Sequence, residues 1–269
     1  MSNGRYKILK VQNEITKEAE DNTAIEEPLE ISITHGSERK IISITMRTPG
    51  NDEELATGFL FTEGIIRNYN SIQSFSVGMN KVTVHINENA ELNLKSSDRN
   101  FYMTSSCGIC GKSSIDSVRT NSQYKVEILN NIISKNIILS LPDTLREHQS
   151  IFDSTGGIHA SGLFDFNGNF ITLKEDVGRH NALDKLAGYA LQNNLIPLAN
   201  NILLLSGRAS FELIQKAMMI GIPVVCAVGA PSSLAIDLAK ENNITLIGFL
   251  RDNRFNIYTY PERIKLNEE

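Results

Sequence analysis

The residues best suited to chemistry are two cysteines, Cys107 and Cys110, in the run Cys-Gly-Ile-Cys-Gly-Lys at 107–112. Serines and glycines surround them, so the segment can bury little apolar surface and is predicted to be an accessible loop. Lys112 and a predicted helix start at Ser113 place positive charge and free backbone N–H groups beside the thiols. Both features favour the thiolate, which is the form that attacks sulfur or binds metal. The pair therefore indicates reactive thiol chemistry.

Three kinds of thiol site are compatible with this spacing. A structural zinc site would need two further ligands, and His159 and His180 are the candidates because Cys226 stands in a predicted buried strand. A thioredoxin-like redox pair fits less well, since the cysteines do not follow a strand in a βαβ unit. The third kind is a nucleophilic or sulfur-carrying cysteine. A zinc deaminase is not indicated, because no histidine of the chain stands in a His-x-Glu motif.

The composition is that of a globular protein with one large domain or two ordinary ones. The 269 residues are 41% hydrophobic and 21% charged, and the formal net charge of −5 argues against general nucleic-acid binding. No apolar run approaches the roughly 20 residues of a membrane helix. Residues 1–23 lack the apolar core of a secretory signal, and three cysteines do not suggest a disulfide framework. We therefore expect a cytoplasmic protein with no nucleic-acid or membrane partner.

The pattern of apolar residues and helix breakers divides the chain into two domains and two tails. The predicted divisions are a tail at 1–24, an α+β domain at 25–138 that ends in the Cys-x-x-Cys loop at 105–114, an α/β domain at 139–262 and a tail at 263–269. Within the α+β domain, the sequence predicts a hairpin at 29–34 and 40–45, a helix at 53–61, a strand at 81–87 and a short strand at 91–94.

The α/β domain has the clearest alternation of strands and helices. After a helix at 141–150, a hairpin at 162–166 and 169–173 and a helix from 176 to 192, strands at 201–205, 223–228 and 245–250 alternate with helices at 210–220 and 232–242. Continuously apolar strands are typical of a parallel sheet with helices on both faces. Ligands of such sheets bind beyond the carboxyl ends of the strands, where the loops 206–210, 229–233 and 251–254 should emerge. Their serines, arginines and backbone N–H groups suit phosphate.

Two further segments concentrate polar groups. The stretch Glu-Asp-Val-Gly-Arg-His-Asn-Ala-Leu-Asp-Lys at 175–185 has two interpretations. It is either a capped, solvated helix with a His180–Asp184 pair four residues apart, or a cluster that faces a ligand. The stretch Thr-Gly-Gly-Ile-His at 155–159 is either a turn or a backbone cradle with His159 above the ligand.

Together these segments resemble the FdhD/NarQ family, the formate dehydrogenase accessory sulfurtransferases, over about residues 26–258. The resemblance depends on six motifs in this order and spacing: Leu-Ala-Thr-Gly-Phe-Leu-Phe-Thr-Glu-Gly at 55–64, Ser-Ser-Cys-Gly-Ile-Cys-Gly-Lys at 105–112, the two polar stretches at 155–159 and 175–185, Ser-Gly-Arg-Ala-Ser-Phe-Glu at 206–212, and Ala-Pro-Ser-Ser-Leu-Ala at 230–235.

The resemblance implies an enzyme that takes sulfur from a cysteine desulfurase as a cysteine persulfide and passes it to the molybdenum (or tungsten) cofactor of formate dehydrogenase. Cys107 matches the persulfide-bearing cysteine and Cys110 the second cysteine of the family. The cofactor, molybdenum bis-(molybdopterin guanine dinucleotide), would be bound transiently, with GDP as a mimic, and no cofactor permanently. The resemblance also implies a homodimer, and a second domain like the cytidine-deaminase fold without its zinc site or any other metal site.

The predicted cofactor contacts come from three sources. The resemblance supplies a C-terminal stretch, Phe249, Leu250, Arg251, Asp252, Asn253 and Arg254. The other strand-end loops and the two polar stretches supply Gly207, Arg208, Ser210, Ser232, His159, Arg179 and His180. Two rival functions remain: a cofactor chaperone that moves no sulfur, and a zinc-dependent binding module.

Overall fold

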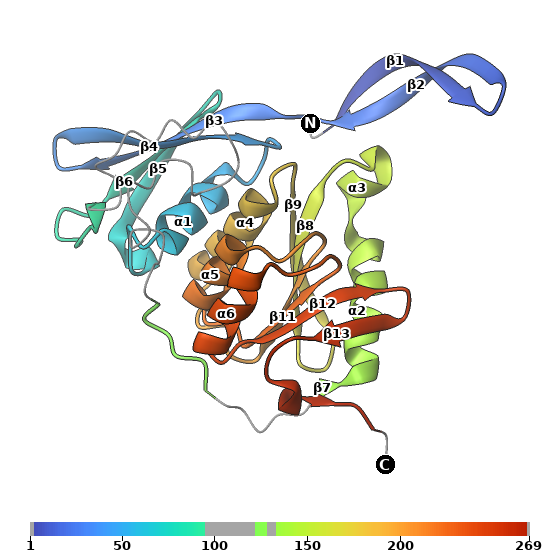
Figure 1. The fold of residues 1–269 in the computed structure, drawn as a ribbon. Coiled ribbons are helices and arrows are strands. Elements are labelled where there is room, and N and C mark those ends of the chain that lie inside the picture. The colour runs from blue at the N-terminus through green and yellow to red at the C-terminus, as the bar shows by residue number, and fades with distance from the viewer. Residues whose placement is uncertain (1–2, 95–121, 128–132, 268–269) are drawn as a thin grey trace.

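The computed structural model describes residues 3–94, 122–127 and 133–267 (Figure 1). The predicted Cys-x-x-Cys loop, with Cys107 and Cys110, lies outside the described residues. The helices are α1 (Asp52–Thr62), α2 (Lys135–His148), α3 (Ser150–Thr155), α4 (Arg179–Gln192), α5 (Phe211–Met219) and α6 (Ser233–Glu241), with 3-10 turns at Tyr69–Ser71 and Pro261–Arg263. None of these helices is both long and apolar enough to cross a bilayer.

The first part of the chain forms a four-stranded sheet with α1 packed on one face. Its strand order is β4-β3-β6-β5, and its strands are β3 (Glu27–His35), β4 (Glu38–Arg47), β5 (Ile72–Gly78) and β6 (Lys81–Ile86). The apolar residues of β3 alternate, so that Leu29, Ile31 and Ile33 all point into the core. The predicted hairpin, helix and 81–87 strand are thereby confirmed. The strand predicted at 91–94 is wrong, and β5 was not predicted.

The second part is a six-stranded mixed sheet of order β13-β12-β11-β10-β8-β9. Its strands are β8 (His159–Asp165), β9 (Phe170–Asp176), β10 (Asn201–Leu205), β11 (Val224–Ala227), β12 (Thr245–Arg251) and β13 (Arg254–Ile257). The three central strands, β10 to β12, are parallel, and β8 runs antiparallel to β10. Both faces of β10 are buried: Leu203 packs with α4 and α5, and Ile202 packs in the cluster that contains α2 residues. The predicted alternation of strands and helices is confirmed here.

Both predicted tails contain regular structure. Residues 3–24 form a hairpin of β1 (Asn3–Gln12) and β2 (Ile15–Ala24) that projects from the body (Figure 1). Its apolar residues fall on both faces, Tyr6 on one and Leu9 on the other, so no one-sided pattern marked it as a strand pair. At the other end, β14 (Ile264–Lys265) pairs with β7 (Ile133–Ser134). Residues 3–24 are therefore not irregular, and the chain after 263 contains a short strand, while the predicted bounds of the domains and tails stay a prediction.

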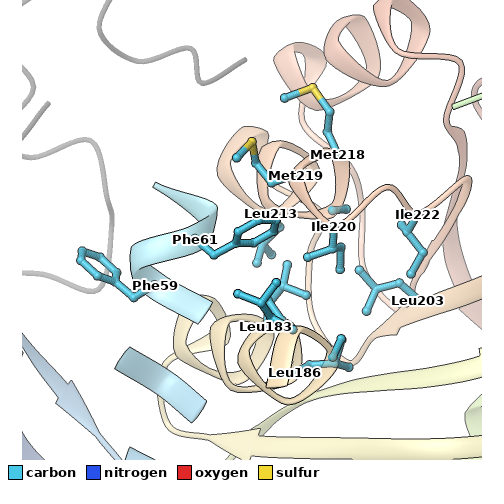
Figure 2. Close-up of a cluster of buried hydrophobic side chains, with 14 of the residues drawn as sticks. Phe59, Phe61, Leu183, Leu186, Leu203, Leu213, Met218, Met219, Ile220 and Ile222 are labelled. Carbon is cyan, nitrogen blue, oxygen red and sulfur yellow. The ribbon is translucent and has the colours of Figure 1, made fainter. Parts of the chain in front are cut away.

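The two parts of the molecule share a core in which α1 lies against α4 and α5. Phe61 of α1 points toward Leu183 of α4 and Leu213 of α5 (Figure 2). Glycines allow this close approach, because a Cβ at Gly58 would overlap the backbone carbonyl of Asp184, and one at Gly188 that of Glu54. This contact positions the first part of the chain against the helices that border the strand ends.

We expect Gly58→Ala to destabilise the protein by about 2 kcal/mol or more, because the added methyl group meets backbone and cannot be relieved by a rotamer change. The free energy of unfolding in denaturant measures this effect. Gly78→Ala is the matched control, since a Cβ there meets nothing within 4 Å. Equal stability of the two variants would contradict close backbone contact between α1 and α4.

Candidate functional site

The carboxyl ends of the central strands lie in a row. The backbone N–H of Gly229, after β11, donates to the carbonyl of Gly207, after β10, at 2.9 Å. Phe249, near the end of β12, donates in turn to the carbonyl of Gly229 at 3.0 Å. Ser232 follows closely, because its N–H donates to the carbonyl of Ala209. The loops at 206–210 and 229–233 therefore meet as predicted, and Phe249 joins them.

His159 extends this row on the other side of β10. It is the first residue of β8, and a Cβ at position 207 would lie 3.4 Å from its Nδ1, so Gly207 leaves the imidazole uncovered on that side. Burial lowers the pKa of His159, and the charges of Arg179 and His180 lower it further, while Asp176 opposes them. Arg179 and His180 open α4. The structure thus brings His159, Arg179, His180 and Gly207 to one place beside the strand ends.

His180 contacts the start of α5. Its Nε2 lies 3.5 Å from Oγ of Ser210 and 3.7 Å from Oε2 of Glu212. The contact with His180 is the main reason that the pKa of Glu212 falls to about 2, against the opposing effect of burial; Ser210 and the backbone N–H of Glu212 also lower it. Glu212 was not among the predicted site residues. A signal was present, because the motif at 206–212 ends on this glutamate and carries Ser210 two residues earlier.

Three buried polar atoms at this place lack a hydrogen-bond partner among the described residues. They are Nδ1 of His180, Nε of Arg179 and Oγ of Ser161. Ser161 lies two residues after His159 on β8, so both side chains point to the same face of the sheet. Buried polar atoms in folded proteins are normally satisfied, so a group of unsatisfied ones is typical of a site completed by a ligand or water.

The other polar residues of the 175–185 stretch have structural roles. The carboxylate of Asp176 is fully buried and accepts hydrogen bonds from Nζ of Lys185 at 2.7 Å and from the backbone N–H groups of Gly178 and Thr48. Asn181 donates to the carbonyl of Met46 and so joins α4 to β4. The interpretation as a solvated helix with a His180–Asp184 pair is therefore wrong, because His180 faces Glu212 while Asp184 faces Lys216.

The predicted stretch from Phe249 to Arg254 is divided by the fold. Leu250 is 1% exposed in the core, so only its backbone groups can reach a ligand. Arg251 and Arg254 are opposite each other in the antiparallel register of β12 and β13. Asp252 and Asn253 form the turn between them and have positive φ. The side chains of all four residues are exposed. No hydrogen bond or ion pair between described residues joins this turn to His159 or Arg179. Phe249 thus belongs to the row of strand ends, and the turn lies beyond it.

The remaining thiol and metal predictions concern different parts of the chain. Cys226 of β11 is fully buried, and burial raises the pKa of its thiol, so it is a poor nucleophile. Within the described ranges, no three His, Cys, Asp or Glu side chains are grouped as metal ligands. The stretch 155–159 joins α3 to β8, with Gly156 at φ 66 as the C-cap of α3 and His159 as the first residue of β8.

Comparison with known proteins identifies the family of this chain and a solved structure with a similar fold. The model of the FdhD/NarQ family matches residues 24–265. The chain belongs to the FdhD/NarQ family. The sulfur carrier protein FdhD of Picrophilus torridus is 50% identical over 91% of this chain and 92% of its own. The sulfur carrier protein FdhD of Streptomyces coelicolor is 44% identical over 97% and 95% of the two chains. A crystal structure of a proposed formate dehydrogenase accessory protein from Desulfotalea psychrophila superposes with a TM-score of 0.77, at 26% identity and over 98% of this chain and all of that one.

Proposed function

We propose that this FdhD/NarQ protein is a sulfur carrier that serves formate dehydrogenase. The observation that carries the proposal is the extent of the similarity: relatives with this printed function match over nearly the full length of both chains. The superposed crystal structure is likewise of a proposed formate dehydrogenase accessory protein. The Cys107 motif supplies the chemistry that a sulfur carrier needs, since an ionised and accessible thiol can accept sulfur.

In the proposed reaction, the Cys107 thiolate attacks the outer sulfur of a persulfide on a cysteine desulfurase. A sulfur–sulfur bond forms on Cys107, the donor's sulfur–sulfur bond breaks, and the donor cysteine leaves as a thiolate. The outer sulfur then passes to the molybdenum cofactor of formate dehydrogenase, which makes the protein a sulfurtransferase. A thiolate such as that of Cys110 supplies the two electrons: it attacks Sγ of Cys107, a disulfide forms between them, and the outer sulfur leaves as hydrosulfide for the cofactor. Cys110 stands three residues after Cys107 in the sequence and is proposed to assist the transfer.

The proposed acceptor carries two guanine dinucleotide tails and is therefore strongly anionic. The row of strand ends suits such a ligand, because Arg208 lies exposed there, packed against Gly229, and its guanidinium can bind phosphate. The arginines of the β12–β13 turn offer a second basic group. A cytidine-deaminase-like second domain, a homodimer and a cytoplasmic location remain part of the proposal.

A labelled-sulfur transfer assay tests the proposed function. Cysteine desulfurase and labelled cysteine would load the protein, which would then be mixed with apo-formate dehydrogenase. Label that appears on the client together with formate oxidation supports a carrier. Full activation of the client by protein that never acquires label would instead identify a cofactor chaperone, and stoichiometric zinc in the purified protein would identify the binding module.

We expect Arg208→Ala to weaken GDP binding about tenfold, which corresponds to the loss of one charge-assisted contact to phosphate. Arg254→Ala, in the β12–β13 turn, is expected to weaken it similarly if the nucleotide spans both groups. Isothermal calorimetry measures both affinities. Lys7→Ala, in the projecting β1–β2 hairpin, is the control. Unchanged affinity in both arginine variants would remove the proposed nucleotide site.

A further inference from the structure

His180 is a buried histidine, and within the described part of the chain only one of its two ring nitrogens contacts a protein group. The residue is 5% exposed. Its Nε2 faces Ser210 and the carboxylate of Glu212, whereas Nδ1 is buried without a partner among the described residues. A carboxylate can only accept a hydrogen bond, so the nitrogen that faces it carries the hydrogen. In the neutral ring, Nδ1 is then left with a lone pair, and it becomes a donor only when a second proton binds.

The surroundings of Nδ1 are suited to an anion. Arg179 precedes His180 at the start of α4, a 14-residue helix whose N-cap, Gly178, supplies no side-chain cap. Its Nε is also unpaired within the described part of the chain, as is Oγ of Ser161 on β8. The free N–H groups of the helix start add partial positive charge. These groups are donors or can become donors, which is what an anionic ligand requires.

The charged groups of each neighbouring element can be identified. From β8, His159 faces His180, and from the end of β9 comes Asp176, whose carboxylate is held by Lys185. From α5, Glu212 is the direct contact. Glu63, the C-cap residue of α1, contacts Lys216, which lies one helical turn beyond Glu212. Glu212 is therefore the carboxylate that acts on His180 directly.

We propose, resting on the function proposed above, that this group is the subsite for a diphosphate of the nucleotide tail, and that Glu212 is the positioning residue that turns Nδ1 of His180 toward it. On binding, Nδ1 takes up one proton from solvent and donates a hydrogen bond to a phosphate oxygen. Binding is consequently linked to proton uptake. Because the pKa of Glu212 is held at about 2, its carboxylate stays ionised at neutral pH.

Calorimetric titration tests this inference with two probes, GDP and inorganic diphosphate. Titration in buffers of different ionisation enthalpy counts the protons taken up, and comparison between variants cancels the ionisation of the probe itself. We expect wild-type protein to take up as much as about one proton more than His180→Asn. Asparagine keeps an amide near the position of Nδ1 but cannot titrate, so this variant should bind with an affinity that changes less between about pH 6 and pH 8.

Glu212→Gln should lower the affinity for both probes about tenfold and reduce proton uptake. Glu212→Asp should restore part of the affinity and part of the proton uptake. Glu54→Gln is the matched control, because Glu54 is similarly buried but pairs with Lys174. Thermal unfolding checks that each variant is folded; if Glu212→Gln is not, His180→Asn decides the question alone.

Wild-type affinity and wild-type proton uptake in both His180→Asn and Glu212→Gln would overturn the subsite, while leaving the sulfur-carrier function intact if labelled sulfur still reaches the client. If the wild-type protein bound neither probe, both the diphosphate subsite and the proposed nucleotide site would be overturned. Loss of labelled-sulfur transfer with normal, proton-linked GDP binding would contradict the proposed function alone.

Discussion

Cys107→Ser is expected to abolish sulfur transfer to formate dehydrogenase, with the protein folded and GDP binding unchanged. The serine hydroxyl is nearly isosteric with the thiol, but it cannot form a persulfide. Since the cysteine loop can contribute little to a core by its composition, the free energy of unfolding should change by less than about 0.5 kcal/mol. Mass spectrometry after incubation with desulfurase and cysteine measures the persulfide, and the labelled transfer assay measures delivery.

The two other cysteines provide the controls for this prediction. Cys226→Ser should retain sulfur loading, because the native thiol is fully buried and burial raises its pKa. Cys110→Ser tests whether Cys110 acts in sulfur loading or in sulfur delivery. If Cys107 is still loaded but no sulfur reaches formate dehydrogenase, Cys110 acts in the second transfer. Detection of persulfide on Cys226 and not on Cys107 would refute the assignment of the carrier cysteine.

Elements with a one-sided or continuous apolar pattern could be predicted from the sequence. Strand β10 was predicted because all of Ile202 to Leu205 is apolar, and β3 because its buried residues alternate. The β1–β2 hairpin has neither pattern, since its strands contact mainly each other and are stabilised by pairing instead of by a core. Arg263 fell within the predicted tail at 263–269. In the structure it is buried, and it donates to Oγ1 of Thr245.

The candidate site could be predicted in its residue types but not in its pairings. Arg179 and His180 stood out as polar groups at a helix start, but nothing local shows which partner faces each. Each of the two helices carries two polar groups that are four residues apart: His180 and Asp184 on one, and Glu212 and Lys216 on the other. When α4 and α5 lie side by side, His180 faces Glu212 and Asp184 faces Lys216. A search for helices with complementary charges at this spacing could have found both contacts. The pairing arises from tertiary packing.

The second of these pairings gives the largest expected effect on stability. Lys216 is almost completely buried, and its Nζ donates to Oδ1 and Oδ2 of Asp184 at 2.9 and 3.0 Å and to Oγ1 of Thr62 at 2.9 Å. Oε1 of Glu63 lies 3.2 Å away. Burial alone would lower the pKa of Lys216, but the carboxylates of Asp184 and Glu63 outweigh it and raise the pKa, so the ammonium group is charged. Burial raises the pKa of Asp184, and Lys216 and Thr62 act against that rise. The network connects α5, α4 and α1.

Lys216→Met is expected to destabilise the protein by about 3–5 kcal/mol, because it leaves the buried Asp184 carboxylate with Thr62 as its one remaining hydrogen-bond donor of this network. Asp184→Asn combined with Lys216→Met should recover part of that loss, since no uncompensated charge then remains in the core. Chemical denaturation of the two single variants and the double variant gives the coupling energy directly.

An exposed ion pair shows what burial contributes to this effect. Arg5 and Glu20 lie 3.7 Å apart on the β1–β2 hairpin, with side chains 74% and 60% exposed. Arg5→Met should therefore change stability by less than about 0.5 kcal/mol. If Lys216→Met were no more harmful than Arg5→Met, or if the double variant were as unstable as the sum of its single variants, the buried network would not hold α1 against α4 and α5. The first part of the chain would then have to be held against the strand-end site by apolar packing alone.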